Sequence, residues 1–206
     1  GSAERSPLLA VLRDHPKTVL HTAAMLLLYA TSFYTLFVWM PTYLTDFVKP
    51  PVDHAMDINT VTMVLLLGAL VGAGWLADKV GPRRVLLAGC ILLGALVYPM
   101  FLVLDHGVWQ EALLMQAVFA VLVGLVQGPV PLILVEAFPA SLRNTAIGLS
   151  YNITLALFGG TAPMVCTWFI ARTNDLAAPA IYLAVLSSFS IVALLMLGRA
   201  PARVES

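Results

Sequence analysis

The sequence predicts an all-α integral membrane protein with six transmembrane helices. Hydrophobic residues make up 60% of its 206 residues and charged residues only 11%, whereas about a quarter of an ordinary soluble domain is charged. Six apolar runs reach the roughly 20 residues that a helix needs to cross the hydrocarbon core. The runs do not alternate apolar and polar residues as the strands of a membrane barrel do. The bilayer is therefore expected to surround helices.

Short connectors separate the predicted spans, so neighbouring spans are expected to be antiparallel. The spans one to six are residues 18–45, 58–77, 85–104, 112–135, 145–171 and 176–198. Residues 1–17 are expected to form a cytoplasmic amino-terminal segment, residues 18–198 the six-helix transmembrane bundle, and residues 199–206 a cytoplasmic tail. Gly1 and Ser2 resemble the scar that tag cleavage leaves, which favours a truncated chain over a naturally short one.

The distribution of basic residues predicts the orientation, because cytoplasmic loops carry an excess of Lys and Arg. One side holds nine of them: Arg5, Arg13, Lys17, Lys79, Arg83, Arg84, Arg143, Arg199 and Arg203. The other side holds Lys49 and Arg172. Both termini are therefore expected in the cytoplasm, which agrees with an even number of spans, since these place both termini on one side. The location expected is a plasma membrane of the bacterial inner-membrane type.

Composition argues against several classes of protein. The formal net charge is zero, so no nucleic-acid partner is indicated. Cys90 and Cys166 lie inside apolar runs and form no metal-ligand spacing, so neither a metal nor another cofactor is expected. An intramembrane enzyme would need a Ser–His pair or clustered aspartates within the membrane, and the spans offer neither. The sequence therefore predicts a protein that is not an enzyme.

Glycines concentrate in two of the spans. Residues 68–74 of span two read Gly-Ala-Leu-Val-Gly-Ala-Gly, and span five carries Gly148, Gly159 and Gly160. Small residues let membrane helices approach closely, so these faces pack either inside this chain or against a second helical bundle. Spans two and five hold matching positions in two sets of three, which hints at a three-plus-three inverted repeat.

A charged loop joins spans two and three, with the sequence GWLADKVGPRR over residues 74–84. Gly74 allows close helix contact at the membrane edge, and Asp78 can accept hydrogen bonds from a neighbouring helix N-terminus. Gly81 permits a sharp reversal of the chain. Arg83 and Arg84 can contact lipid phosphates or carboxylates. Without further information, this loop would be only a topology signal.

A second charged pair follows span four, where Glu136 and Arg143 stand on either side of Pro139. An ionisable group at such a position suggests a functional role. The alternative is an ordinary interfacial ion pair, which contributes little to stability.

The loop resembles the signature G-x-L-A-D-[RK]-x-G-[RK]-[RK] of the major facilitator superfamily, with Pro82 in place of the first basic residue after Gly81. Residues 147–152 and 158–163 resemble the eleventh helix of its metabolite:proton symporters, which include α-ketoglutarate, citrate, shikimate and proline/betaine carriers. Residues 32–44 are similar to their seventh helix, and residues 178–183 to the start of their twelfth. The resemblance thus covers helices seven to twelve, half of the family fold.

The resemblance implies that spans one, two, four and five face a central cavity and that spans three and six face lipid. It also implies that Glu136, Arg143 and the loop arginines form a charge cluster in the outward-open state, which breaks when the inner gate opens. The candidate substrate-binding residues are the polar side chains on the cavity side: Tyr29, Tyr34, Gln127, Tyr151 and Asn152. Helix packing is the alternative role for each, and Gln127 also precedes two prolines that leave backbone carbonyls without partners.

The function expected is half of a secondary active transporter, a proton-coupled symporter of a small carboxylate or zwitterion that works by alternating access. Its partner would be the missing amino-terminal six-helix half or a second copy in a homodimer, with membrane lipid, substrate and protons as its other contacts. The middle of each span lacks charged residues, so the proton-coupling residue is expected outside this chain. The alternative is a membrane scaffold or assembly partner that keeps the bundle and does not transport.

Overall fold

The computed structural model describes residue 11 and residues 13–197 as an all-helical bundle. Six stretches are long and apolar enough to cross a membrane: Pro16–Phe47, Ala55–Val80, Pro82–Leu104, Trp109–Ala137, Arg143–Thr173 and Ala178–Met196. These stretches confirm the six predicted spans and are spans one to six in the same order. The tag-like Gly1 and Ser2, the basic residues Arg5, Arg199 and Arg203, and the predicted tail lie outside the described residues.

Span one changes its helical geometry twice. It begins as α2 (Pro16–Phe33), widens into the π-helix η1 (Tyr34–Trp39), continues as the short α3 (Met40–Thr42) and ends as a second π-helix, η2 (Tyr43–Phe47). Each π turn inserts an extra residue and re-aims the side chains that follow, and such turns are frequent at functional sites. The two ends of span one therefore present different faces from those of one regular helix.

Spans two and three are regular helices joined by a tight reversal. Span two is α4 (Ala55–Val80) and span three is α5 (Pro82–Leu104). Gly81 lies between them with a φ of 97°, a conformation that favours glycine. Pro82 is the first residue of α5, where a missing N–H costs nothing and the fixed φ suits the helix. Pro82, which departs from the family signature, thus begins the helix of span three.

Spans four and five are each interrupted. Span four is α6 (Trp109–Gln127) followed by α7 (Val130–Ala137), with Pro129 between them. Span five is α8 (Arg143–Thr154), the π-helix η3 (Leu155–Gly159) and α9 (Ala162–Thr173). Span six is the single helix α10 (Ala178–Met196). The helix of span four thus breaks after Gln127, next to the two prolines at 129 and 131.

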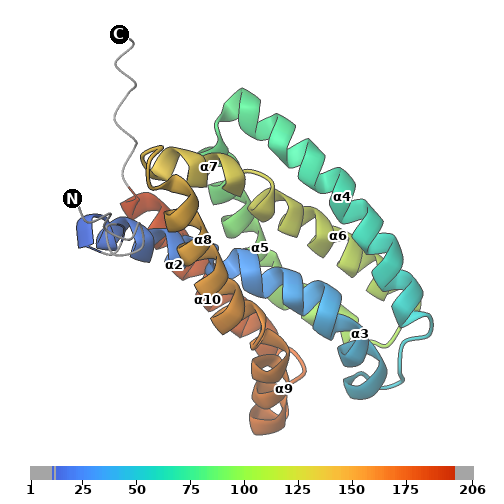
Figure 1. Ribbon diagram of the computed structural model, residues 1–206. Coiled ribbons are helices and arrows are strands. Elements are labelled where there is room, and N and C mark those ends of the chain that lie inside the picture. The colour runs from blue at the N-terminus through green and yellow to red at the C-terminus, as the bar shows by residue number, and fades with distance from the viewer. Residues whose placement is uncertain (1–10, 12, 198–206) are drawn as a thin grey trace, which may run out of the picture.

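The six spans form a front layer and a back layer in the view of Figure 1. Helices α4, α6, α2 and α8 lie toward the viewer, and α5 and α10 lie behind them. In the most apolar stretch of each span, 61% of residues are buried in spans one and four, 44% in spans three and six, and 22% and 28% in spans two and five. Burial therefore repeats with a period of three spans, as an inverted repeat would require, and spans two and five are the most open.

The glycines of span four pack inside the bundle. A Cβ atom added to Gly124 would lie 2.6 Å from Cβ of Ala69, and one added to Gly128 would lie 2.7 Å from Cβ of Ala73. Spans two and four therefore approach closely along this line. By contrast, a Cβ added to Gly72 would meet no atom within 4 Å.

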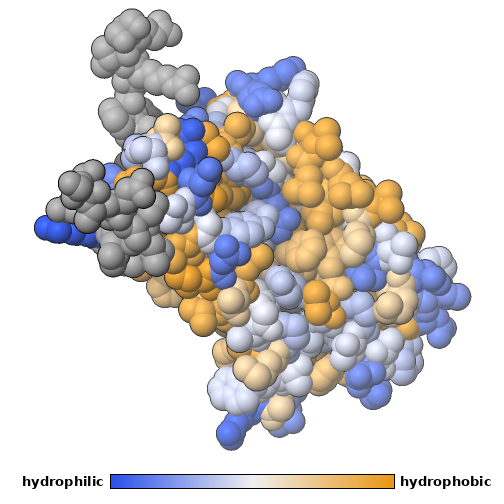
Figure 2. All heavy atoms as spheres, viewed as in Figure 1, coloured by the Kyte–Doolittle hydropathy of each residue, from blue (hydrophilic) through white to orange (hydrophobic). Residues whose placement is uncertain are grey.

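The glycine face of span two is open as a whole, because Gly68 and Gly74 likewise have no atom within 4 Å of an added Cβ. In span five, a Cβ on Gly148 would have only the Asn152 amide at 4.0 Å. Packing inside the chain therefore explains neither the span-two glycines nor Gly148, whereas Gly159 packs against the Tyr34 ring. Figure 2 shows the same side of the molecule, where hydrophilic and weakly polar residues run between two apolar areas.

Candidate functional site

Two tyrosines from spans one and five meet within the bundle. The Tyr29 and Tyr151 hydroxyl oxygens lie 3.1 Å apart, within hydrogen-bonding distance. Their rings contact edge to face, with centroids 5.6 Å apart. Both residues are half-buried, so the pair combines apolar ring surface with two hydroxyl groups. It ties α2 to α8 and leaves part of each ring accessible.

Gln127 joins this pair from span four. It is the last residue of α6, and its Nε2 donates a hydrogen bond of 3.1 Å to the backbone oxygen of Tyr29. Only 7% of Gln127 is exposed, so its amide is committed to this carbonyl. The structure thus brings together three predicted site residues, Tyr29, Tyr151 and Gln127, and gives Gln127 a positioning contact.

The remaining two predicted site residues lie nearby in the chain and differ in surroundings. Tyr34 is the first residue of η1, and its half-buried ring packs where Gly159 has no side chain, since a Cβ there would lie 2.8 Å from the ring. Asn152 follows Tyr151 on α8 and is exposed. Tyr34 therefore occupies the junction of the π segments of spans one and five, whereas Asn152 is exposed beside Gly148.

The predicted charge cluster lies where spans two and four end and where spans three and five begin. Asp78 and Glu136 are exposed. The arginines contact backbone oxygens: Arg83 that of Leu197 at 2.6 Å, Arg84 that of Val80 at 3.5 Å, and Arg143 that of Phe138 at 3.4 Å. Within the described part of the chain, the side chains at salt-bridge distance are His54–Asp57 at 3.1 Å and His106–Glu111 at 2.7 Å, pairs that are ionic when the histidine is protonated. A charge cluster of Glu136, Arg143 and the loop arginines stays a prediction.

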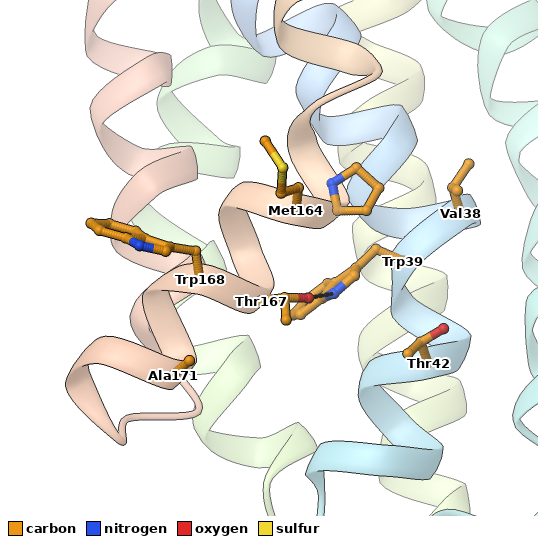
Figure 3. A pocket seen from close by; sticks show the side chains of 8 residues that line it. Val38, Trp39, Thr42, Met164, Thr167, Trp168 and Ala171 are labelled. Carbon is orange, nitrogen blue, oxygen red and sulfur yellow. Dashed lines mark hydrogen bonds between the residues drawn. The ribbon is translucent and has the colours of Figure 1, made fainter.

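A groove that sequence reasoning missed lies between the carboxy-terminal parts of spans one and five (Figure 3). Its volume is about 490 Å³, and the residues that line it are Val38, Trp39, Thr42, Pro163, Met164, Thr167, Trp168 and Ala171. Trp39 Nε1 donates a hydrogen bond of 3.0 Å to Thr167 Oγ1 across its floor. Most of these residues are apolar, so in the sequence they look like ordinary lipid-facing positions.

Comparison with known proteins gives matches over almost the whole chain. The family model for "Sugar (and other) transporter" matches residues 8–198. The ectoine/proline transporter ProP of Corynebacterium glutamicum is 28% identical over 193 residues, which are 94% of this chain and 38% of that protein. The proline/betaine transporter of Salmonella typhimurium is 26% identical over 88% of this chain and 36% of its own length. A putative proline/betaine transporter of Staphylococcus aureus is 25% identical over 93% of this chain and 42% of its own.

These matches place the chain in a family of multi-pass membrane transporters and not in a family of enzymes. The chain belongs to the sugar (and other) transporter family of the major facilitator superfamily. It spans about two fifths of the length of the relatives above. Its six spans agree with half of the family fold.

Proposed function

We propose that this chain is half of a proton-coupled symporter for a small zwitterion, and that it works by alternating access against a second six-helix bundle. The observation that carries the proposal is similarity over nearly the whole chain to proteins named as proline/betaine and ectoine/proline transporters. The tyrosine pair and the open faces of spans two and five support it.

The chemistry of the site favours a zwitterion over a dicarboxylate. Every charged residue of the described spans lies within three residues of a span end, so a carboxylate would find no buried cation here. Tyrosine rings attract a cation to their faces, and quaternary ammonium ligands are recognised in this way. Tyr29, Tyr34 and Tyr151 would contact the ammonium end of the substrate, and the second bundle would supply the partner of its carboxylate.

The open glycine face supports a second bundle. Gly68 and Gly72 have free space where a side chain would stand, and small residues at a membrane-helix surface allow a second backbone to approach. The occupant would be the amino-terminal half of the family fold or a second copy of this chain. The proton-coupling residue would lie in that second bundle, and both termini of this chain would face the cytoplasm.

The cytoplasmic charges would act as the gate of this half. Asp78 and Glu136 are exposed at the cytoplasmic ends of spans two and four, where a carboxylate is free to accept hydrogen bonds from arginines. We expect Glu136, Arg143 and the loop arginines, Arg83 and Arg84, to form one charge cluster when the inner side is closed, with the Glu136 carboxylate accepting hydrogen bonds from the arginines. The cluster would separate when it opens.

Proton-driven uptake tests the proposed function. The purified chain is reconstituted in liposomes, alone or with the complementary bundle, and an inward proton gradient is imposed with labelled proline betaine, citrate or α-ketoglutarate outside. We expect protonophore-sensitive uptake of proline betaine and none of citrate or α-ketoglutarate. Tyr29→Leu and Tyr151→Leu, which remove the aromatic ring, should each reduce uptake, whereas Tyr98→Leu, a matched change at an exposed residue of span three, should not.

Two results would overturn the proposal in different ways. Uptake of citrate but not proline betaine would refute the assigned substrate class and leave a transporter. Absence of uptake of all three by folded chains, with and without the complementary bundle, would favour the scaffold function.

A further inference from the structure

Gln116 is a fully buried amide in span four with unmet hydrogen-bonding capacity. It is 0% exposed, and neither its Nε2 nor its Oε1 has a hydrogen-bond partner among the residues that the structure describes. Burying an amide without partners is costly, and buried polar groups in proteins are nearly always paired with protein or with ordered water. Gln116 therefore requires an explanation.

The direction of Gln116 follows from that of Gln127. The two residues are eleven positions apart in the continuous helix α6, which is just over three turns at 3.6 residues per turn. They therefore lie on the same face. Because Gln127 contacts the Tyr29 carbonyl, this face is directed at span one, and the antiparallel direction of the two spans places Gln116 at the level of Met40.

The contacts of the span-four glycines show which residues of span two lie level with Gln116. Gly124 meets Ala69 and Gly128 meets Ala73, so spans two and four run parallel with a constant offset in residue number. The same offset brings Gln116 to the level of span two between Asn59 and Thr62.

Asn59 is a second buried amide with unmet capacity at this level. It is 9% exposed, its Nδ2 donates 3.3 Å to the Phe37 carbonyl of η1, and its Oδ1 has no partner within the described residues. Two buried amides thus converge on the irregular part of span one, where the helix passes from a π turn to α3 and back. This place lies about three turns from the Tyr29–Tyr151 pair, on the outer side of it.

We infer that Gln116, Asn59 and the adjoining segment of span one hold an internal water site. The choice of ligand follows from the unmet groups. A cation would satisfy the amide oxygens but not Gln116 Nε2, which needs an acceptor. Water both donates and accepts, and a buried water typically makes about three hydrogen bonds to otherwise unsatisfied polar groups. It would hold the span-one segment in place through the two amides.

X-ray hydroxyl-radical footprinting of the chain in lipid nanodiscs tests this site, because radiolysis of a bound water oxidises the side chains beside it. Met40 and Met25 make a matched pair, since both are on span one and both are 0% exposed, but only Met40 is level with Gln116. We expect Met40 to be oxidised severalfold faster than Met25. Equal, slow oxidation of both would overturn the site and favour a direct Gln116–Asn59 bond in a dry interior.

A variant pair connects the signal to Gln116. In Gln116→Leu, we expect Met40 oxidation to fall to the Met25 rate, while Met25 itself stays protected and so reports an intact bundle. Gln110→Leu removes an exposed glutamine of the same helix and should leave Met40 oxidation unchanged. A Met40 rate that does not change in Gln116→Leu would overturn the inference. Asn59→Leu gives the same test from span two if the Gln116 variant does not fold.

Discussion

Adding one methyl group to Gly124 should separate spans two and four. In Gly124→Ala, the new Cβ would lie 2.6 Å from Cβ and 3.0 Å from the backbone carbon of Ala69. Carbon atoms in contact prefer about 3.5–4.0 Å, so the helices must move apart by about 1 Å at this point. Because one of the clashing atoms is backbone, a side-chain rotation does not relieve it. Overpacking of this kind costs about 1–3 kcal/mol.

Gly72→Ala is the matched control, since an added Cβ at Gly72 meets no atom within 4 Å. Both changes replace a helical glycine by alanine and gain about the same intrinsic helix propensity, about 1 kcal/mol. The difference between the two variants therefore isolates the clash with Ala69. We expect Gly124→Ala to be less stable than Gly72→Ala by about 1–3 kcal/mol.

Reversible unfolding in mixed micelles, followed by tryptophan fluorescence, measures the two free energies of unfolding. Equal stability of the two variants would refute the close approach of spans two and four. A larger loss in Gly72→Ala would show that span two packs inside the bundle through its glycine face, which would also remove one support for a second bundle.

Three further changes test single contacts. Gln127→Leu removes the amide that donates to the Tyr29 carbonyl. It should lower the free energy of unfolding by about 0.5–1.5 kcal/mol and weaken substrate uptake. An unchanged uptake affinity would argue against a positioning role for Gln127. Trp39→Phe removes the hydrogen bond to Thr167. A double-mutant cycle with Thr167→Val should give a coupling free energy of about 0.6 kcal/mol, which is typical of polar pairs in membranes. A coupling of zero would contradict the contact. Ser187→Ala removes a hydroxyl that donates to a span-three carbonyl and should lower the unfolding free energy by about 1 kcal/mol, with no loss if that carbonyl finds another donor.

The six spans could be predicted from the sequence because the bilayer sets a minimum length of apolar helix. Span three ends at Leu104, as predicted, and begins at Pro82 instead of residue 85. The difference arises because Pro82 is itself an acceptable first helical residue, although hydropathy places it outside the apolar run. Helix starts are set by local backbone chemistry, which a hydropathy pattern does not contain.

The π-helical segments could not be predicted. η1 and η3 contain ordinary apolar and aromatic residues, and nothing in their composition distinguishes them from α-helix. Their geometry depends on neighbouring spans: the Tyr34 ring, at the start of η1, packs against Gly159, at the end of η3. A contact between residues this far apart in the chain is decided by tertiary packing.

The candidate site was predictable in its residue types but not in its contacts. A polar side chain inside an apolar span is conspicuous, which is why Tyr29, Gln127 and Tyr151 could be selected. That Gln127 bonds a backbone carbonyl, and that the two tyrosine hydroxyls meet, requires the relative rotation of three helices. The groove at Trp39 was missed for the opposite reason, because apolar residues in a membrane span carry no distinguishing signal.

Photo-cross-linking tests the central claim, that the open face of this half meets a second six-helix bundle, most directly. A photoreactive residue is placed at Val71 of span two, which is 75% exposed, and for comparison at Phe189 of span six, which is 58% exposed. The chain is then irradiated in membranes that also contain the amino-terminal half. Val71 should form a protein adduct with that half or with a second copy, and Phe189 should react with lipid. Lipid adducts alone at Val71, or equal protein adducts at both positions, would contradict the account.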